Sequence, residues 1–298
     1  MEKVINNIIK KHKNIFGENL IVNKINIGFT NILYDINNKY IVKICINENN
    51  EENFKKEIHF YKENKDNNLI PRLYVSCVDK KDIPYFYEII EKIDGVSLYN
   101  VWHTLDDFKR EEIIKKLCDC MKLFHKNKGA SYDWSYNITK QFCVLFEQAQ
   151  KLNLFSATEL DIIENAYSKF NNYLKSEEFV LIHNDLHFDN IFISNDNIKL
   201  IDFERSMYAP VDFELDILYR MIRKPWKFAS EESEKFTRLE DYKNIMSYIE
   251  KYYPEIMSVN NLYERLAIYD MVYFLEQFLE YPHIEELKID VLNAAKLV

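Results

Sequence analysis

The sequence predicts an α+β protein with two lobes: a small N-terminal lobe with an antiparallel β-sheet and one helix, and a large, mainly helical C-terminal lobe. Strand-like runs rich in Ile, Val and Tyr dominate the first third, and long helical patterns follow Asp94-Gly95. With only 4 Gly and 6 Pro in 298 residues, no flexible linker separates independent modules. We therefore expect packed lobes at residues 1–93 and 94–298.

The N-terminal lobe follows from local patterns. Gly28 and Asn37-Asn38 interrupt the first apolar stretch and predict a turn and a hairpin. Phe54, Ile58 and Tyr61 recur at helical spacing and predict the single helix of the lobe. The expected elements are a helix at 2–14, three strands within 20–46, a helix at 50–64, and strands at 72–78 and 84–92.

The C-terminal lobe is predicted from longer helical patterns. Gly129 follows the first of these helices, where a glycine in the left-handed conformation commonly ends a helix. Short strands are expected around residues 181–201. The expected helices cover 105–127, 137–152, 158–175 and most of the chain from 212 onward.

Composition excludes several classes of protein. A net charge of −9 disfavours nucleic acid and anionic membrane surfaces, which need clustered Lys and Arg. No apolar run approaches the roughly 18 residues of a membrane span, and the charged N-terminus lacks a signal-peptide core. Five cysteines, with no C-x-x-C pair, argue against a disulfide framework and a zinc ribbon. These features predict a soluble cytoplasmic protein with no obligatory protein partner.

The stretch "LIHNDLHFDNIF" (181–192) carries the densest polar cluster. Two strand-like runs follow around Asn195-Asp196, a typical hairpin turn. A hairpin centred there would place Asn190 opposite Ile201 or Asp202, with Cβ atoms roughly 5 Å apart. An amide and a carboxylate oxygen could then share one Mg²⁺, a cation that prefers oxygen ligands. Asp185 would remain a separate carboxylate, free to accept a proton, as phosphoryl transfer requires.

Two other readings of this cluster stay open. His183, Asp185 and His187 could ligate Zn²⁺ or Fe²⁺ in a metal hydrolase, but the remaining histidines are isolated and form no further ligand pair. Alternatively, these residues are exposed polar side chains with no catalytic role, and the predicted position of Asp202 near Asn190 is then a coincidence.

The motif "HNDLHFDN" resembles the H-x-D-x-x-x-x-N loop of the aminoglycoside phosphotransferase and choline kinase superfamily, which has a protein-kinase-like fold. "LIDFE" is similar to the metal-binding segment that follows that loop. The resemblance implies an ATP- or GTP-dependent kinase with Asp185 as catalytic base and Mg²⁺ on Asn190 and Asp202. It implies a structural role for His183.

Further matches imply a nucleotide site. Lys43 in "YIVKIC" resembles the strand lysine that contacts the α- and β-phosphates, and Glu57 resembles its helix partner. "NIGFTNILYDI" resembles the nucleotide-covering loop, so that backbone near Gly28 and Thr30 would bind phosphate. "IIEKIDG" is similar to the hinge, which would hold the purine through Glu91 and Ile93. Asp216 matches a late aspartate that orders the catalytic loop.

The resemblance also implies the acceptor class. The family phosphorylates small hydroxylated cations, and we expect an aminoglycoside, which would make the protein an antibiotic-resistance kinase. His187, Glu204, Trp226 and Asp270 are the candidate acceptor contacts. Choline or ethanolamine kinase is the alternative, because aromatic faces bind quaternary ammonium groups. A catalytically silent kinase-like binding protein is a remote alternative, and a protein kinase is disfavoured because no A-P-E-like element follows Asp202.

Overall fold

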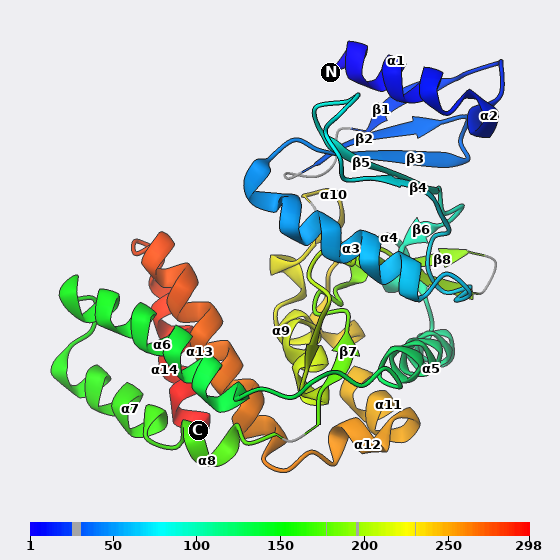
Figure 1. Ribbon diagram of the computed structural model, residues 1–298. Coiled ribbons are helices and arrows are strands. Elements are labelled where there is room, and N and C mark those ends of the chain that lie inside the picture. The colour runs from blue at the N-terminus through cyan, green and yellow to red at the C-terminus, as the bar shows by residue number, and fades with distance from the viewer. Residues whose placement is uncertain (26–30, 177, 195–196, 230) are drawn as a thin grey trace. The chain divides into compact units, whose positions relative to one another are not determined.

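The computed structural model describes residues 1–25, 31–176, 178–194, 197–229 and 231–298. The chain forms two compact units. The first unit comprises Met1–Val101 and Phe188–Ser206, and the second comprises Trp102–His187 and Met207–Val298. An antiparallel sheet in the N-terminal part and helices in the C-terminal part confirm the predicted α+β class (Figure 1). The lobe boundary expected between residues 93 and 94 stays a prediction.

The main sheet of the first unit has five antiparallel strands in the order β1-β2-β3-β5-β4. Its strands are β1 (Val22–Ile25), β2 (Asn31–Ile36), β3 (Tyr40–Cys45), β4 (Leu73–Cys77) and β5 (Phe86–Glu91). All five were predicted. Asn37 and Asn38 have φ values of 59° and 55°, the left-handed pair that a tight hairpin turn requires, so the hairpin is confirmed. The turn expected at Gly28 lies outside the described residues.

Helices cover both faces of this sheet. On one face α1 (Glu2–Lys11) packs its Ile5 and Ile8 into a cluster with Val42 and Ile44. On the other face α3 (Glu51–Glu63) packs against Cys45 and Phe86. Because side chains alternate along a strand, Lys43 points to the face that α3 covers. The short elements α2 (Lys13–Phe16) and η1 (Glu48–Asn50) complete this region. The helix expected at residues 2–14 is therefore divided between α1 and α2.

A small three-stranded sheet, in the order β6-β8-β9, also belongs to the first unit. It is formed by β6 (Val96–Ser97), β8 (Ile191–Ser194) and β9 (Asn197–Leu200), with α4 (Leu98–Val101) and η3 (Phe188–Asn190) beside it. Gly95 is required for close packing, because a Cβ atom there would lie 2.5 Å from the Ile193 carbonyl oxygen.

The second unit is mainly helical, and its long helix α13 packs against α6 and α14 (Figure 1). Its helices are α5 (Asp107–Phe124), α6 (Trp134–Lys151), α7 (Ala157–Tyr167), α8 (Phe170–Tyr173), α9 (Leu215–Arg223), α10 (Glu231–Glu234), α11 (Ile245–Tyr252), α12 (Pro254–Met257), α13 (Leu262–Glu280) and α14 (Glu285–Leu297). Single-turn 3₁₀ helices are η2 (Trp102–Thr104), η4 (Val211–Glu214), η5 (Pro225–Lys227) and η6 (Leu239–Asp241), and β7 (Val180–Ile182) pairs with β10 (Met207–Ala209).

Two predictions for this unit were wrong in detail. The helix expected at 158–175 is divided into α7 and α8. Gly129 is not a left-handed cap, because α5 ends at Phe124 and Gly129 does not have a positive φ. Instead, a Cβ atom at Gly129 would lie 2.3 Å from the Tyr208 ring, so close packing requires glycine there.

Across the described ranges, no helix combines the length and the hydrophobicity that a membrane span needs.

Candidate active site

The predicted strand lysine and helix glutamate are in direct contact. Lys43 Nζ lies 2.5 Å from Glu57 Oε2, and Glu57 is 1% exposed. The contact follows from the fold, because Lys43 points to the sheet face that α3 covers and Glu57 lies on the buried side of that helix. A buried ion pair costs desolvation and needs good geometry, so its presence here indicates a constrained position for the ammonium group.

Glu204 and Asp202 complete the surroundings of Lys43 within the first unit. Glu204 Oε1 lies 2.8 Å from Lys43 Nζ, and Asp202 Oδ1 lies at 3.6 Å. Asn50 Nδ2 donates to Glu204 at 3.0 Å, and Asn31 Nδ2 also donates to it. Burial lowers the pKa of Lys43, but the three nearby carboxylates outweigh it and raise that pKa well above its usual range. Lys43 is therefore a permanently charged group held by acids.

Glu88 is a fourth acid beside Lys43, and the sequence analysis missed it. It lies directly opposite Lys43 in the β3–β5 pairing and is fully buried. Neither carboxylate oxygen has a hydrogen-bond partner within the described part of the chain. Burial, reinforced by Glu57, raises the pKa of Glu88 well above its ordinary value. Burial therefore favours the neutral form of Glu88 in the folded protein.

The β8–β9 hairpin has one of the two predicted registers. Ile191 lies opposite Leu200, and the Ile201 amide donates to the Asn190 carbonyl oxygen at 3.1 Å. Asn190 therefore faces Ile201, with Asp202 one residue further along. Asp202 has a φ of 64°, a left-handed conformation that Asp tolerates better than most residues.

The donors at this end of the hairpin fit Mg²⁺. Asn190 is buried, and Asp202 Oδ1 is buried without a hydrogen-bond partner among the residues that the structure describes. Ligand oxygens of Glu57, Asp202 and Glu204 lie within 4.8 Å of one another. Lys43 already binds Glu57 and Glu204 closely, whereas its contact with Asp202 is long. Asp202 is therefore the acid of this group with most capacity for a hard cation.

In the second unit, Glu214 holds the loop that carries Asp185. The His183 amide donates to Glu214 Oε2 at 2.9 Å, and the Asn184 amide donates to Oε1 at 3.1 Å. His125 Nε2 lies 3.1 Å from Glu214 Oε2. Burial raises the pKa of Glu214, but His125 and the loop amide outweigh that effect and lower the pKa, so Glu214 is ionised. Asn184, with a φ of 61°, turns the chain immediately before Asp185.

Asp216, which we expected to order this loop, has a different partner. Its carboxylate receives the Arg220 guanidinium one helical turn along α9, with Nη2 to Oδ2 at 2.5 Å. The loop contact expected of Asp216 is made by Glu214, two residues earlier. His183 directly follows β7 and is fully buried, and the structural role expected of it stays a prediction.

Asp185 and His187 lie close together at the surface of the second unit. The side chain of Asp185 is 17% exposed, and His187 Nε2 lies 3.9 Å from its Oδ2. The His187 amide donates to the Asp185 carbonyl oxygen at 2.9 Å. Solvent can therefore reach the carboxylate expected to act as base.

Glu91 and Ile93, which we expected to contact the purine, lie at and after the end of β5. Glu91 is the last residue of β5, and its carboxylate binds Lys199 Nζ at 2.9 Å. Ile93 follows outside the strand and is buried. Gly28 and Thr30 lie outside the described residues.

The expected acceptor contacts are divided between the two units. Glu204 belongs to the first unit and binds Lys43, whereas Trp226 and Asp270 belong to the second. Trp226 is 40% exposed in η5. Asp270 is 1% exposed and forms ion pairs with Arg220 and Arg223, so its charge is already compensated.

The lysine-bearing antiparallel sheet, the helix that supplies its glutamate and the helical second unit together define a kinase-like phosphotransferase fold. A family model described as the phosphotransferase enzyme family matches residues 22–242. The chain belongs to this family. A comparison with curated proteins finds no match.

Solved structures share the fold at low sequence identity. The ADP-bound aminoglycoside phosphotransferase APH(2'')-Ib is 18% identical, with a TM-score of 0.68 over 99% of this chain and 97% of that chain. The gentamicin complex of APH(2'')-IIa is 17% identical, with a TM-score of 0.65 over 100% and 95%. The GDP complex of wild-type aminoglycoside 2'-phosphotransferase-IIIa is 13% identical, with a TM-score of 0.68 over 99% and 96%.

Proposed function

We propose that this phosphotransferase moves the γ-phosphate of ATP or GTP to a hydroxyl group of a small cationic acceptor. The observation that carries the proposal is the charge arrangement at Lys43, which the buried Glu57 holds at 2.5 Å beside Asp202. An ammonium group fixed in this way can neutralise nucleotide phosphates. The ADP and GDP complexes of structural relatives support a nucleotide donor.

Each expected site residue then has a role. Asn190 and Asp202 would hold Mg²⁺, which would neutralise phosphate charge when bound. Asp185 would orient the acceptor hydroxyl and take its proton. In the nucleotide site, backbone groups of Glu91 and Ile93 would bind the purine, and the loop with Gly28 and Thr30 would cover the phosphates.

An aminoglycoside is the acceptor that we favour, which would give the protein a role in antibiotic resistance. A relative that binds gentamicin supports this choice. Choline or ethanolamine is the second candidate, because exposed aromatic side chains such as Trp226 could receive an alkylammonium group. Tyr273 is less available for such a role, since the Arg220 guanidinium carbon already lies 4.1 Å from its ring centroid.

One panel of assays tests the proposal. Nucleotide consumption is measured with ATP or GTP and Mg²⁺, with kanamycin, gentamicin, choline, ethanolamine or no acceptor. We expect aminoglycoside-dependent turnover that falls about 10²- to 10⁴-fold in Asp185→Asn. Asp161→Asn, on the exposed side of α7, is the matched control and should retain activity. Turnover on choline alone would make choline, and not an aminoglycoside, the acceptor. Turnover in Asp185→Asn equal to that of the wild type would refute the mechanism. Nucleotide binding without turnover on any acceptor would support the silent alternative.

A further inference from the structure

A cavity of about 220 Å³ lies within the second unit, between α9, η5, α13 and α14. We propose that this cavity binds a compact organic anion, a carboxylate or a phosphate ester attached to a small apolar group. The inference does not depend on the proposed function, because it concerns binding at a cavity whose lining residues all belong to one unit.

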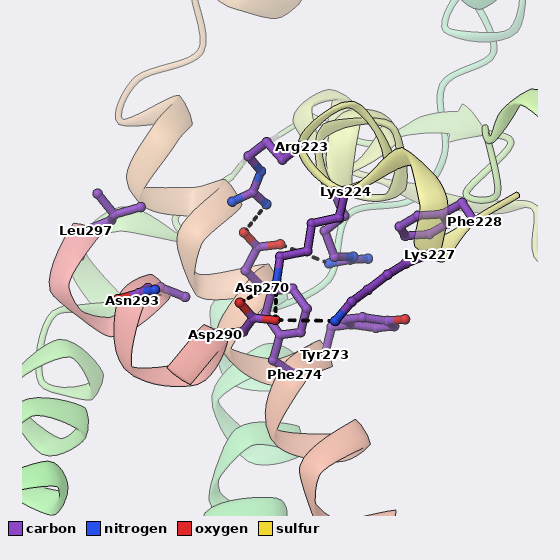
Figure 2. Close-up of a pocket in the computed structure, with 12 residues that line it drawn as sticks. Arg223, Lys224, Lys227, Phe228, Asp270, Tyr273, Phe274, Asp290, Asn293 and Leu297 are labelled. Atoms are coloured by element: carbon purple, nitrogen blue, oxygen red, sulfur yellow. Dashed lines mark hydrogen bonds and ion pairs between the residues drawn. The ribbon is translucent and has the colours of Figure 1, made fainter. Parts of the chain in front are cut away.

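The charges that line the cavity are predominantly positive. Four cations, Arg220, Arg223, Lys224 and Lys227, come from α9 and the turn after it, and two acids, Asp270 and Asp290, face them. Figure 2 shows the ends of the Lys224 and Lys227 side chains converging on Asp290, while Arg223 reaches Asp270. The lining therefore has two more cationic than acidic side chains.

Both acids of the lining are already neutralised. Asp270 binds Arg220 at 3.4 Å and also binds Arg223. Lys224 Nζ lies 2.5 Å from Asp290 Oδ2. A cationic ligand would have to displace one of these resident cations and would meet the others at close range. Repulsion of that kind disfavours a polyamine in this cavity.

The cations, in contrast, retain capacity for an anion. Asp216 and Glu286 also pair with them from outside the lining, yet several donors are left over. Arg220 is 4% exposed, and its Nε has no acceptor in the described part of the chain. A buried donor without an acceptor is rare and indicates a ligand or water.

Two partly exposed cations add to this capacity. Arg223, with 37% of its side chain exposed, uses Nε and Nη2 for Tyr219 and Asp270 and leaves Nη1 for a ligand. Lys227 Nζ lies 3.2 Å from Glu286 Oε2 and 3.8 Å from Asp290 Oδ2, and both contacts are longer than those that Lys224 makes with the same acids. An anion could bind these groups without breaking the shorter ion pairs.

The remaining walls set the size and the polarity of the ligand. They consist of one amide, Asn293, and five largely apolar side chains: Phe228, Tyr273, Phe274, Ala294 and Leu297. A volume of about 220 Å³ is below the roughly 300–1,000 Å³ of typical drug-sized sites. A single ring or short chain bearing one acidic group therefore matches the cavity better than a nucleotide or an oligosaccharide.

A matched series of one-ring probes tests the proposal. Benzoate, phenyl phosphate, benzyl alcohol and benzylamine are titrated calorimetrically into the full chain with ADP and Mg²⁺ present, so that anion binding at a nucleotide site is suppressed. We expect at least one anion to bind, and the neutral and cationic probes to bind at least tenfold more weakly. The anion that binds with the lower Kd, benzoate or phenyl phosphate, shows whether the cavity prefers a carboxylate or a phosphate ester. No binding of either anion, or binding of benzylamine as tight as that of the anions, overturns the proposal.

Variants locate the binding within the cavity. In Arg223→Gln/Lys227→Gln we expect the Kd for the anion to rise roughly tenfold or more, whereas Lys243→Gln, an exposed cation paired with Glu240, leaves it unchanged. An unchanged Kd in the double variant overturns the proposal. If the double variant does not fold, Arg223→Lys/Lys227→Arg preserves the charges and should retain binding, and Lys227→Gln alone should weaken it. The opposite pattern contradicts the site.

Discussion

At the scale of single residues, the notable feature is how many acids surround Lys43. Glu57, Asp202 and Glu204 contact it, and Glu88 lies opposite it on the neighbouring strand. One ammonium group cannot compensate four carboxylates, three of them buried, because each buried ionised acid loses hydration. Burial, reinforced by Glu57, raises the pKa of Glu88 and so favours its protonated form.

Glu88 should therefore make stability depend on pH. The unfolded chain ionises this group above its ordinary pKa of 4.5, while the folded protein keeps the proton, so Glu88 lowers stability as pH rises. The slope for one such group is about 1.4 kcal/mol per pH unit until the folded-state pKa is reached. Glu88→Gln removes this slope. The unfolding free energy of the variant minus that of the wild type should therefore increase from pH 5 to pH 8, as measured by urea denaturation.

A control separates this effect from a general change in charge. Glu178→Gln removes an acid whose side chain is 81% exposed and should leave the pH dependence as in the wild type. A constant difference in unfolding free energy between wild type and Glu88→Gln from pH 5 to 8 would show that Glu88 is ionised when buried.

At the scale of elements, the loop between β7 and η3 depends on Glu214. This carboxylate receives two loop amides and His125, and His125 Nδ1 in turn lies 2.8 Å from the Tyr253 hydroxyl. Glu214→Gln replaces one acceptor oxygen with a donor, which leaves at least one buried amide unsatisfied at a cost of about 1–3 kcal/mol.

The loop prediction is that Glu214→Gln lowers kcat at least tenfold and leaves the nucleotide KM within about twofold, because the loop carries Asp185 and the nucleotide contacts lie elsewhere in the chain. Steady-state kinetics with varied nucleotide measures both constants. Glu159→Gln is the control: it makes the same change of an acid to an amide in the capping box of α7, where glutamine can also accept the N-cap amide, and should leave kcat unchanged. A raised nucleotide KM with an unchanged kcat in Glu214→Gln would contradict the assignment.

The β8–β9 hairpin and the loop with Asp185 differ in how far the sequence predicts them. The β8–β9 register was predictable to within one residue, because the positions of the strand-like runs around Asn195-Asp196 limit the pairing to two registers. The acid that holds the loop with Asp185 was not predictable, since Glu214 and Asp216 are equally plausible by spacing and only packing turns one to the loop and the other to Arg220.

Pairing between distant parts of the chain cannot be predicted from local sequence patterns. Arg220 lies 50 positions before Asp270 in the sequence, so no local pattern predicts their ion pair. Glu88 could have been found, because it shares a strand face with buried Phe86 and Ile90 in an otherwise apolar run. An acid in an apolar strand predicts a buried carboxyl group with a perturbed pKa.

At the scale of the whole molecule, each compact unit contains two segments of the chain, and the two chain crossings near the polar motif fall between His187 and Phe188 and between Ser206 and Met207. Asp185 therefore belongs to one unit, and Asn190 and Asp202 belong to the other. Asp185 and Asn190 are nevertheless only five positions apart in the sequence.

Nucleotide binding should stabilise the whole chain. At a ligand concentration 100 times Kd, ATP with Mg²⁺ would add about 2.7 kcal/mol to the free energy of unfolding. Thermal or urea denaturation of the full chain with and without the nucleotide measures the gain. Lys43→Met should lose most of it, whereas Lys39→Met, an exposed lysine that lies just before β3, should keep it. An equal gain in Lys43→Met would remove Lys43 from the nucleotide site.

The proposed mechanism gives separate roles to these residues: Asn190 and Asp202 would bind Mg²⁺, and Asp185 would take the proton of the acceptor hydroxyl. Calorimetric titration of ATP with and without Mg²⁺, combined with turnover, tests it in wild type, Asp202→Ala and Asp185→Asn. We predict that Asp202→Ala loses the Mg²⁺-dependent part of the affinity, while Asp185→Asn binds as the wild type does and loses turnover about 10²- to 10⁴-fold. Loss of Mg²⁺-dependent binding in Asp185→Asn, with binding intact in Asp202→Ala, would contradict the account.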